Sequence, residues 1–506
     1  MGISSALYSG ISGLTTMSEN MNVIGNNIAN VNTIGFKSSS ATFQDVLAQS
    51  VATASGTGQI GRGVQLGAIT PQFTEGSFET TSNATDLAIG GNGFFIVTPQ
   101  NQTTQYYTRA GSFDFDSEGN FVNSAGDVVQ GWALDANGND VGTLGDIKLS
   151  TFTSPPSATS QLTTITNLDS TATADSNSLI AAWNGQDPTA PIADTSYAYS
   201  TTQQVYDSQG NSHDITIYYN PVNSKNTDYA AGTTDPTDPT NTWEYIVTCN
   251  PSEDLRAGFQ GTAAQGILMT GTLTYDPTTG DISSVSAYTD DSGTAPDTAA
   301  NWTESSFSSA GYPETTAQFV SGVPQTISLD MGIRSTSGEW SDGGTSTLAD
   351  VQGGTALGTS DWQPEAQTST QYAASSSTTY QTQNGYAPGF LNSISVDTDG
   401  IMTGSYSNGQ DLKLFQIGLA KFNDEQALTD VGNSLWSANT QSGDPITGQP
   451  NNTGLGNISP DSLEQSNVDI ATEFVNMITT QRGYEANSKV ITTVDTMLSD
   501  LINIIR

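Results

Sequence analysis

The sequence has very few of the residues on which enzyme sites and disulfide frameworks depend. Its 506 residues include one cysteine, Cys249, and one histidine, His213. A single cysteine excludes an intrachain disulfide, and this pair of counts excludes most zinc sites and cysteine–histidine nucleophile pairs. A lone histidine beside Asp214 at a strand start is more often structural than catalytic. The sequence therefore predicts neither a metal site nor a cofactor.

Positive charge is also scarce. The chain carries 12 lysines and arginines against 51 acidic residues, which gives a formal net charge of −39. Residues 1–72 are neutral and residues 437–506 carry −5, so most of the acidic excess lies between them. Acid at this density would repel phosphates. It argues against a nucleic-acid partner and favours a hydrated outer surface.

Long apolar runs are missing as well. No run of about 20 apolar residues is present, so no membrane insertion is expected. Residues 1–35 contain no lysine or arginine and no continuous apolar core, both of which a cleavable secretory signal needs. We therefore expect a chain that stays inside the cell, or that leaves it by a route without signal cleavage.

The first 31 residues carry apolar side chains at the spacing of a coiled-coil seam. Steps of four and three residues connect Ile3, Leu7, Gly10, Leu14, Met17, Met21, Ile24, Ile28 and Val31. This pattern predicts a helix that buries one stripe against a partner. Glycines at 10, 13 and 25 each cost about 1 kcal/mol relative to alanine in a helix interior, so the helix should be weak alone.

The last 40 residues predict a second long helix, over 467–506. Ser466 and Asp469 approximate a capping box, and Pro460 lies upstream. One apolar seam runs through Ile470, Phe474, Met477, Tyr484, Ile491, Leu498, Ile502 and Ile505, and a second through Val490, Val494, Met497, Leu501 and Ile504. An apolar arc this wide needs several neighbours. An ordinary two-helix core is the alternative.

Between the two helices the pattern is that of strands and turns. Alternating aromatic and β-branched residues recur at 93–100, 105–115, 120–134, 203–219, 242–248, 266–288, 390–409 and 412–422. Weakly patterned polar stretches at 150–200 and 335–385 indicate boundaries. The expected fold class is α+β. A terminal helical coiled-coil inner domain, with the N- and C-terminal segments paired, would carry nested, mainly β outer domains.

Some acidic turns resemble the beginning of a metal-binding loop but lack its last ligand. Asp114, Asp116 and Glu118 resemble the start of a calcium loop, but the position that needs a bidentate glutamate is Ala125. We therefore interpret the segment as an acidic hairpin turn. No catalytic residue stands out, and the prediction is that the chain is not an enzyme. Two alternatives remain open, an acidic β-rich adhesin on a helical stalk and a polysaccharide hydrolase with paired carboxylates.

Several motifs resemble those of the bacterial flagellar rod and hook family. NNIANVNTIGFK at 26–37 is similar to its N-terminal signature, and LEQSNVDIATEF, from residue 463, to its C-terminal signature. Interior segments such as DLAIGGNGFFIV and YYTRAGSF resemble the hook branch of the family. The matching signature residues are Asn27, Ala29, Asn30, Gly35, Phe36, Lys37, Glu464, Ser466, Asn467, Val468 and Asp469.

The resemblance implies a structural subunit that self-assembles into the flagellar hook, a curved and flexible helical tube that transmits motor torque to the filament. It also implies export of the unfolded chain through the flagellar type III system, without signal cleavage, to an extracellular position. The implied partners are further copies of the chain, the hook cap protein, the distal rod protein, the hook–filament junction protein and the export apparatus. The expected assembly residues are Ile3, Leu7, Leu14, Met17, Met21, Ile24, Ile28, Val31, Phe474, Met477, Tyr484, Ile491, Leu498, Leu501, Ile502 and Ile505.

The predicted domain organisation is nested. The inner helical domain is expected at 1–35 and 463–506, a connecting segment at 36–72 and 437–462, and a β-rich inner-middle domain at 73–150 and 370–436. Residues 151–369 are expected to form one or two outer β domains, with an insertion inside 225–369, where no family motif aligns.

Overall fold

The computed structural model divides the chain into two compact units. Unit 1 comprises Met1–Phe152 and Phe390–Arg506, and unit 2 comprises Thr153–Gly389. The described residues are 2–53, 56–135, 138–173, 178–222, 241–290, 292–293, 296, 301–340 and 362–505. The side chains of residues 2–4, 49–53, 56–60, 501 and 504–505 are outside the described part.

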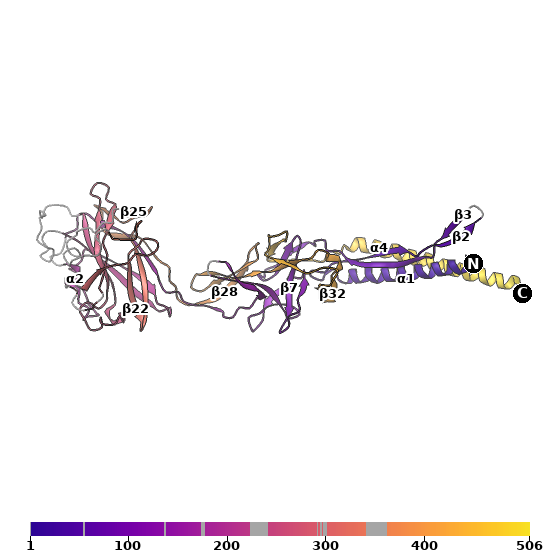
Figure 1. Ribbon diagram of the computed structural model, residues 1–506, viewed down its shortest axis with the longest axis horizontal. Coiled ribbons are helices and arrows are strands. Elements are labelled where there is room, and N and C mark those ends of the chain that lie inside the picture. The colour runs from indigo at the N-terminus through magenta and orange to yellow at the C-terminus, as the bar shows by residue number, and fades with distance from the viewer. Residues whose placement is uncertain are drawn as a thin grey trace. The chain divides into compact units, whose positions relative to one another are not determined.

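Two long helices form one end of unit 1. α1 (Gly2–Ala29) and α4 (Ile470–Ile505) lie side by side and run in opposite directions (Figure 1). The prediction of a long helix at each end of the chain is thereby confirmed, whereas coiled-coil geometry stays a prediction. An antiparallel ribbon of β1 (Ser39–Asp45) and β4 (Val64–Pro71) contacts α1. In the sequence, the hairpin of β2 (Gln49–Thr53) and β3 (Gly56–Ile60) lies between these two strands.

The rest of unit 1 is β-structure built from both ends of the chain. Its largest sheet has the order β28-β29-β30-β11-β7-β8-β33-β32, and further pairs join β31 to β7, β6 to β35 and β5 to β36. The strands of the N-terminal segment are β5 (Phe78–Thr80), β6 (Leu87–Gly90), β7 (Phe94–Pro99), β8 (Tyr106–Thr108), β9 (Phe113–Phe115), β10 (Phe121–Asn123), β11 (Asp127–Leu134) and β12 (Asp140–Asp146). The C-terminal segment supplies β28 (Gly389–Val396), β29 (Ile401–Tyr406), β30 (Asp411–Ile417), β31 (Leu419–Lys421), the 3₁₀ turn η3 (Glu425–Ala427), β32 (Thr429–Gly432), β33 (Leu435–Ser437), β34 (Ile446–Gly448), β35 (Asn457–Pro460) and β36 (Ser462–Glu464).

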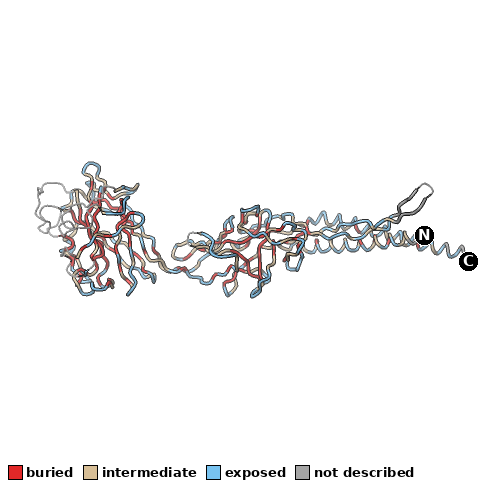
Figure 2. Tube along the Cα trace, viewed as in Figure 1, coloured by how far each residue is buried: buried red, intermediate tan, exposed pale blue. Residues whose placement is uncertain are grey.

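Burial differs between the two ends of unit 1. Buried residues concentrate in its β-structure, whereas α1 and α4 are largely exposed or half-buried (Figure 2). The rings of Phe95 and Phe113 meet edge to face at 5.0 Å inside the β core. The β-structure therefore has a core of its own, and the helix pair has little.

Unit 2 consists of two sheets packed face to face. One has the order β22-β23-β14-β26, with β27 also paired to β14, and the other has the order β15-β16-β17-β18-β20-β21, with β19 also paired to β18. Its elements are β13 (Thr153–Ser154), β14 (Gln161–Asp169), α2 (Leu179–Ala182), β15 (Tyr199–Tyr206), β16 (Ser212–Pro221), β17 (Thr242–Cys249), η1 (Pro251–Glu253), β18 (Ile267–Tyr275), β19 (Ile282–Val285), β20 (Tyr288–Asp290), β21 (Trp302–Glu304), β22 (Glu314–Val320), β23 (Val323–Asp330), β24 (Ile333–Ser335), β25 (Trp362–Pro364), β26 (Thr370–Tyr372) and β27 (Ser377–Gln383).

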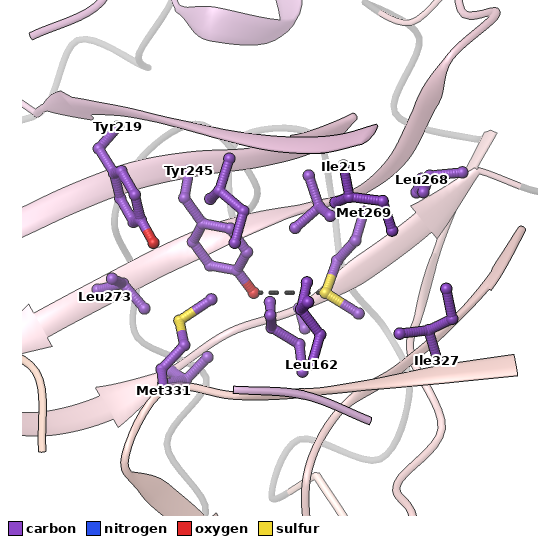
Figure 3. Packing of buried hydrophobic residues seen from close by; sticks show 14 of the residues in the cluster. Leu162, Ile215, Tyr219, Tyr245, Leu268, Met269, Leu273, Ile327 and Met331 are labelled. Carbon is purple, nitrogen blue, oxygen red and sulfur yellow. Dashed lines mark hydrogen bonds between the residues drawn. The ribbon is translucent and has the colours of Figure 1, made fainter. Parts of the chain in front are cut away.

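The core of unit 2 joins the two sheets. Figure 3 shows Leu162 and Ile327 from one sheet facing Tyr245 and Met269 from the other. The hydroxyl of Tyr245 lies 3.6 Å from the sulfur of Met269 and donates to the carbonyl of Ser286 at 2.9 Å. Alternating sequence segments thus become sandwich strands, and the prediction of a mainly β interior is confirmed.

One strand of the interior lies where the sequence pattern is weak. The polar stretch 150–200 indicated a boundary, and the two units do divide between Phe152 and Thr153, but the same stretch also contains β14, which is buried along nearly its whole length. β14 pairs in parallel with β23 and β26 and antiparallel with β27. Its sequence, QLTTITNLD, is rich in threonine, and the hydroxyls of Thr163 and Thr164 have hydrogen-bond partners in Asp330 and Gln203.

Candidate functional site: the paired ends of the chain

A buried ion cluster joins the two signature segments. The Nζ of Lys37 lies 2.5 Å from Oε1 of Glu464, and Nη1 of Arg109 lies 3.5 Å from the other carboxylate oxygen. All three side chains are at most 2% exposed. Lys37 also donates to the carbonyl of Thr74 at 2.7 Å, and the N–H of Gly76 donates to Glu464 at 2.9 Å. We call this cluster, with the backbone ties described next, the clasp.

Burial sets the electrostatics of the clasp. It lowers the pKa of Lys37 below its usual value, although the adjacent carboxylate of Glu464 favours the charged form. Burial also raises the pKa of Glu425, and the positive charges of Arg109 and Lys37 oppose that shift. Lys37 and Arg109 are two buried cations that share the carboxylate of Glu464. Loss of any one of the three side chains would destabilise the fold, because it would leave a buried charge unpaired.

Two asparagines extend the clasp along the backbone. Asn27 accepts from the N–H of Ser39 and donates to its carbonyl, both at 2.9 Å. Asn467 accepts from the N–H of Ser38 at 2.8 Å and donates to the carbonyl of Gln72 at 2.8 Å. Each side chain imitates a strand partner. The asparagines thereby fix the segment that leaves α1 against the segment that enters α4.

Gly35 is required by the geometry of the clasp. Its N–H donates to the carbonyl of Glu464 at 2.8 Å, and its φ of +67° lies in the left-handed region. A Cβ at this position would lie 2.4 Å from the backbone nitrogen of Ala110. Any other residue would be strained in conformation and would collide with the backbone beside Arg109.

The seam between α1 and α4 contains polar and small residues at regular intervals. Nδ2 of Asn27 lies 3.0 Å from Oε1 of Glu473, and Nδ2 of Asn20 lies 2.8 Å from Oγ1 of Thr480. Farther along, a Cβ on Gly13 would lie 2.7 Å from the side chain of Asn487. The helices thus approach closely at a contact that is largely polar.

Apolar contacts fill the intervals between these polar pairs. A Cβ on Gly10 would lie 3.1 Å from the side chain of Ile491, and a Cβ on Gly483 would lie 3.2 Å from the sulfur of Met17. Glycines that weaken α1 as an isolated helix therefore admit side chains of α4 at this seam.

The assembly residues expected from the sequence fall into three groups. On α1 and the turn after it, Ile24 is buried and Leu7, Leu14, Met17, Met21, Ile28 and Val31 are half-buried. On α4, Met477, Ile491 and Leu498 are half-buried, whereas Phe474, Tyr484 and Ile502 are exposed. The side chains of Ile3, Leu501 and Ile505 lie outside the described residues.

Apolar side chains of α4 face away from α1. Ile470, Phe474, Val475 and Ile478 are 45%, 49%, 60% and 50% exposed. They occupy the first turns of the helix, where the residues toward α1 are Glu473 and Thr480. Pairing with α1 therefore leaves an apolar face uncovered, which an ordinary two-helix core would not do.

The capping box predicted at Ser466 is wrong. The hydroxyl of Ser466 accepts from the N–H of Val468 in a turn before the helix. Asp469 is the N-cap, because its carboxylate accepts from the N–H of Ala471 at 2.9 Å and from the hydroxyl of Thr472 at 2.8 Å. The hydroxyl of Thr472, and then the N–H of Ala471, hold the pKa of Asp469 below its usual value.

Sequence reasoning missed five residues at this site: Asn20, Arg109, Glu473, Thr480 and Asn487. Arg109 could have been noticed because bases are rare in this chain, with 12 in 506 residues. The other four are polar residues at seam positions. Only the structure shows that Asn20 pairs with Thr480, that Glu473 pairs with Asn27, and that Asn487 lies against Gly13.

Among the described residues, no metal-binding cluster competes with the clasp. In the described part of the chain, no cluster of three histidine, cysteine or acidic side chains could hold a metal ion. Within that same part, no helix combines the length and apolarity needed to cross a membrane. His213 is stacked on Phe319 at 4.1 Å, and its ring nitrogens contact carboxylate oxygens of Asp207 and Glu253. This histidine is a packed structural residue.

Models of known families match four segments of the chain. The model described as "Flagella basal body rod protein" matches residues 7–37, and "Flagellar hook protein FlgE/F/G D1 domain" matches 88–166. "Flagellar basal body protein FlaE D2 domain" matches 167–386, and "Flagellar basal body rod FlgEFG protein C-terminal" matches 460–504.

Similarity to complete relatives decides the family. The sequence is 32% identical to flagellar hook protein FlgE of Borreliella burgdorferi over 99% of both chains, and 30% identical to that of Salmonella typhimurium over 98% of both. The chain belongs to the flagellar hook protein family. A crystal structure of Helicobacter pylori flagellar hook protein FlgE2 matches 76% of this chain and 100% of its own at 14% identity, but its TM-score of 0.44 is too low to carry an argument.

Membership of the flagellar hook protein family establishes the class of function. The family is structural and not enzymatic, which excludes the hydrolase alternative. The chain is therefore a structural subunit of the flagellar hook, located in the hook or basal body. Self-polymerisation within the flagellar axis is the assembly that the family implies.

Proposed function

We propose that copies of this chain polymerise through the outward apolar face of α4 into a curved, flexible tube that acts as a universal joint. In this proposal α1 and α4 form a coiled coil in the inner wall of the tube. The strongly acidic middle of the sequence forms its hydrated outside, where polar contacts can exchange as the joint bends.

The observation that carries the proposal is the exposure of Ile470, Phe474, Val475 and Ile478 on a helix whose other side is already occupied by α1. Fully burying an apolar side chain of this size contributes about 1.5–3 kcal/mol, and these four side chains have about half of their surface left to bury. Together they favour self-association once neighbours supply the cover. A second copy is the natural neighbour because self-polymerisation is the assembly implied by the family.

Further parts of the proposal rest on the sequence. The assembly set includes the half-buried seam residues and Ile3, Leu501 and Ile505. The domain organisation is the nested one given above, in which 1–35 and 463–506 are innermost. The chain leaves the cell unfolded through the flagellar type III apparatus, to an extracellular hook. There it meets the cap protein, the distal rod protein and the hook–filament junction protein.

A pair of charge substitutions on α4 tests the proposal. Phe474→Asp places a charge in the apolar face, and Thr479→Asp places the same charge at an exposed polar position as the control. Purified full-length chains are allowed to polymerise and are viewed by electron microscopy. We expect tubes from the parent and the control but none from Phe474→Asp. The β units of that variant should unfold in urea as in the parent.

Removal of residues 467–506 gives a second test. The truncated chain lacks α4 and should form no tubes. Normal tubes from either the truncated chain or Phe474→Asp would contradict the assignment of α4 to the subunit contact.

A further inference from the structure

Three contacts between α1 and α4, two of them hydrogen-bonded polar pairs, form a ladder with a repeat of seven residues. Its rungs are Gly13 with Asn487, Asn20 with Thr480, and Asn27 with Glu473. Each rung lies seven residues from the next along both helices. The two hydrogen-bonded rungs are 2.8 Å and 3.0 Å long, and Asn27 and Thr480 are buried. We call this set the ladder.

A seam with a seven-residue repeat has a problem of register. Apolar contacts are not directional, so two such helices can pair almost as well after one slides by seven residues along the other. Polar residues at seam positions remove that ambiguity, because a buried amide needs a specific partner at a specific height. The ladder places such polar residues at seam positions of both helices.

A slip of one repeat would change the partner of every rung. If α4 moved so that Asn20 faced Asn487, Asn27 would face Thr480 and Gly13 would face Val494. The hydrogen bond between Asn27 and Glu473 would be lost, and Glu473 would have no rung partner on α1. A branched apolar side chain would replace the amide of Asn487 beside Gly13. The observed register is the one that pairs Glu473 with Asn27 and places Asn487 against Gly13.

We infer that the ladder sets the register of α1 against α4, and thereby the height at which α4 presents its outward apolar residues to a second copy of the chain. This inference rests on the proposed polymerisation through that face. A slip of seven residues would displace the face by about 10 Å relative to α1. Asn20, Thr480 and Asn487 thus act as positioning residues for assembly without touching the neighbour.

Cysteine reporters can read the register directly, because the only natural cysteine, Cys249, is buried in unit 2. Met17→Cys with Gly483→Cys joins positions that face each other in the structure. Met17→Cys with Val490→Cys joins positions that face each other after a slip of one repeat. A disulfide forms only when the two Cβ atoms come within about 4.5 Å, so the rates of oxidation compare the two registers.

The ladder residues are then substituted in chains that carry each reporter pair. The ladder variant carries Asn20→Leu, Thr480→Leu and Asn487→Ala, which keep the Asn27 rung because Asn27 also belongs to the clasp. The matched control carries Asn22→Leu, Thr479→Leu and Asn476→Ala at exposed positions of the same helices. Disulfide formation is measured in the soluble full-length chain by gel mobility, and tube formation by electron microscopy.

With the ladder intact, the facing pair should cross-link at least about tenfold faster than the slipped pair, and the control should behave likewise. In the ladder variant this ratio should fall at least about fivefold, and its tubes should be absent or irregular. An unchanged ratio in the ladder variant would overturn the inference, because the clasp alone would then set the register. Cross-linking of neither pair in the ladder-intact chain would overturn it too.

The experiment distinguishes failure of the proposed polymerisation from failure of the ladder inference. A parent that forms no tubes but shows the expected change in cross-linking contradicts polymerisation through α4 and leaves the ladder's role in register standing.

Discussion

Lys37 and Glu464 lie 427 residues apart in the sequence, and their side chains meet at 2.5 Å in the interior of unit 1. Neither side chain has any exposed surface. One belongs to the segment that follows α1 and the other to the segment that precedes α4. The contact therefore ties the two signature motifs into one structure. It gives a physical reason for a lysine in the N-terminal motif and a glutamate in the C-terminal motif.

Removing one member of this pair should destabilise unit 1. Lys37→Met leaves Glu464 with the guanidinium of Arg109 at 3.5 Å and the N–H of Gly76, and breaking a buried ion pair costs about 3–5 kcal/mol. Urea unfolding of the full-length chain measures this loss. Lys148→Met, at an exposed lysine, is the matched control and should change stability by less than about 0.5 kcal/mol. Equal stability of the two variants would contradict the structural role of the clasp.

Two glycines of α1 should respond oppositely to alanine. A Cβ at Gly13 would lie 2.7 Å from the side chain of Asn487, whereas a Cβ at Gly25 would have no atom within 4 Å. Gly25→Ala should therefore stabilise the helix by about 0.5–1 kcal/mol, and Gly13→Ala should weaken its pairing with α4. Circular dichroism of the soluble chain measures helicity. Gly13→Ala together with Asn487→Ala should recover it, and a gain from Gly13→Ala alone would show that the helices do not approach there.

The start of α4 should depend on acid pH through Asp469. Because the pKa of this carboxylate is held below its usual value of 3.8, its stabilisation is fully present above that value and is lost as the pH falls through the lower folded-state pKa. Asp469→Ala should thus lower helicity at pH 6 but match the parent at the acid end. Asp469→Asn keeps a capping oxygen without a charge and should be less damaging. A pH-independent difference between the parent and Asp469→Ala would exclude the charge as the cause.

Cys249 should be unreactive in the folded chain. The thiol is buried in the core of unit 2, and burial raises its pKa well above the usual value, so the thiolate is absent at neutral pH. Alkylation by iodoacetamide should be at least about 100-fold slower in buffer than in urea, measured by mass spectrometry. Rapid alkylation in buffer would mean that the sandwich opens at this strand, and the reporter pairs would then need Cys249→Ser.

The sequence pattern predicted the elements with strong periodicity. The long helices at the two ends and the aromatic strands, such as β7 and β17, all appear where alternating or seam spacing indicated them. The signature motifs also directed attention to Lys37, Glu464 and Asn467, although their mutual contacts could not be read from separate segments.

β14 shows why the rest could not be predicted. Thr163, Thr164 and Thr166 contribute to the weak, polar pattern of the stretch 150–200, yet all three are buried. The hydroxyl of Thr163 donates to the carboxylate of Asp330, and the N–H of Thr166 donates to the hydroxyl of Ser369. These partners come from 167 and 203 residues away. Local hydropathy cannot record a polar group that is satisfied by a distant one.

The orientation of α4 was beyond prediction for a related reason. Hydrophobicity alone would place Phe474 and Ile470 against α1, and the predicted seam included both. In the structure Glu473 and Thr480 occupy the contact, because Asn27 and Asn20 on the other helix require hydrogen-bond partners. The apolar seam of an isolated sequence therefore does not show which neighbour it faces.

The pairing of β5 with β36 and of β6 with β35 sets an order of events for a chain that emerges from its N-terminus. Unit 2 contains all its strands within 153–389 and can close as soon as that stretch is free. β5 and β6 of unit 1 find their strand partners only in residues 457–464, so these two strands stay unpaired until about the last tenth of the chain arrives. The unit that bears α1 and α4 can therefore be completed only when nearly the whole polypeptide has emerged.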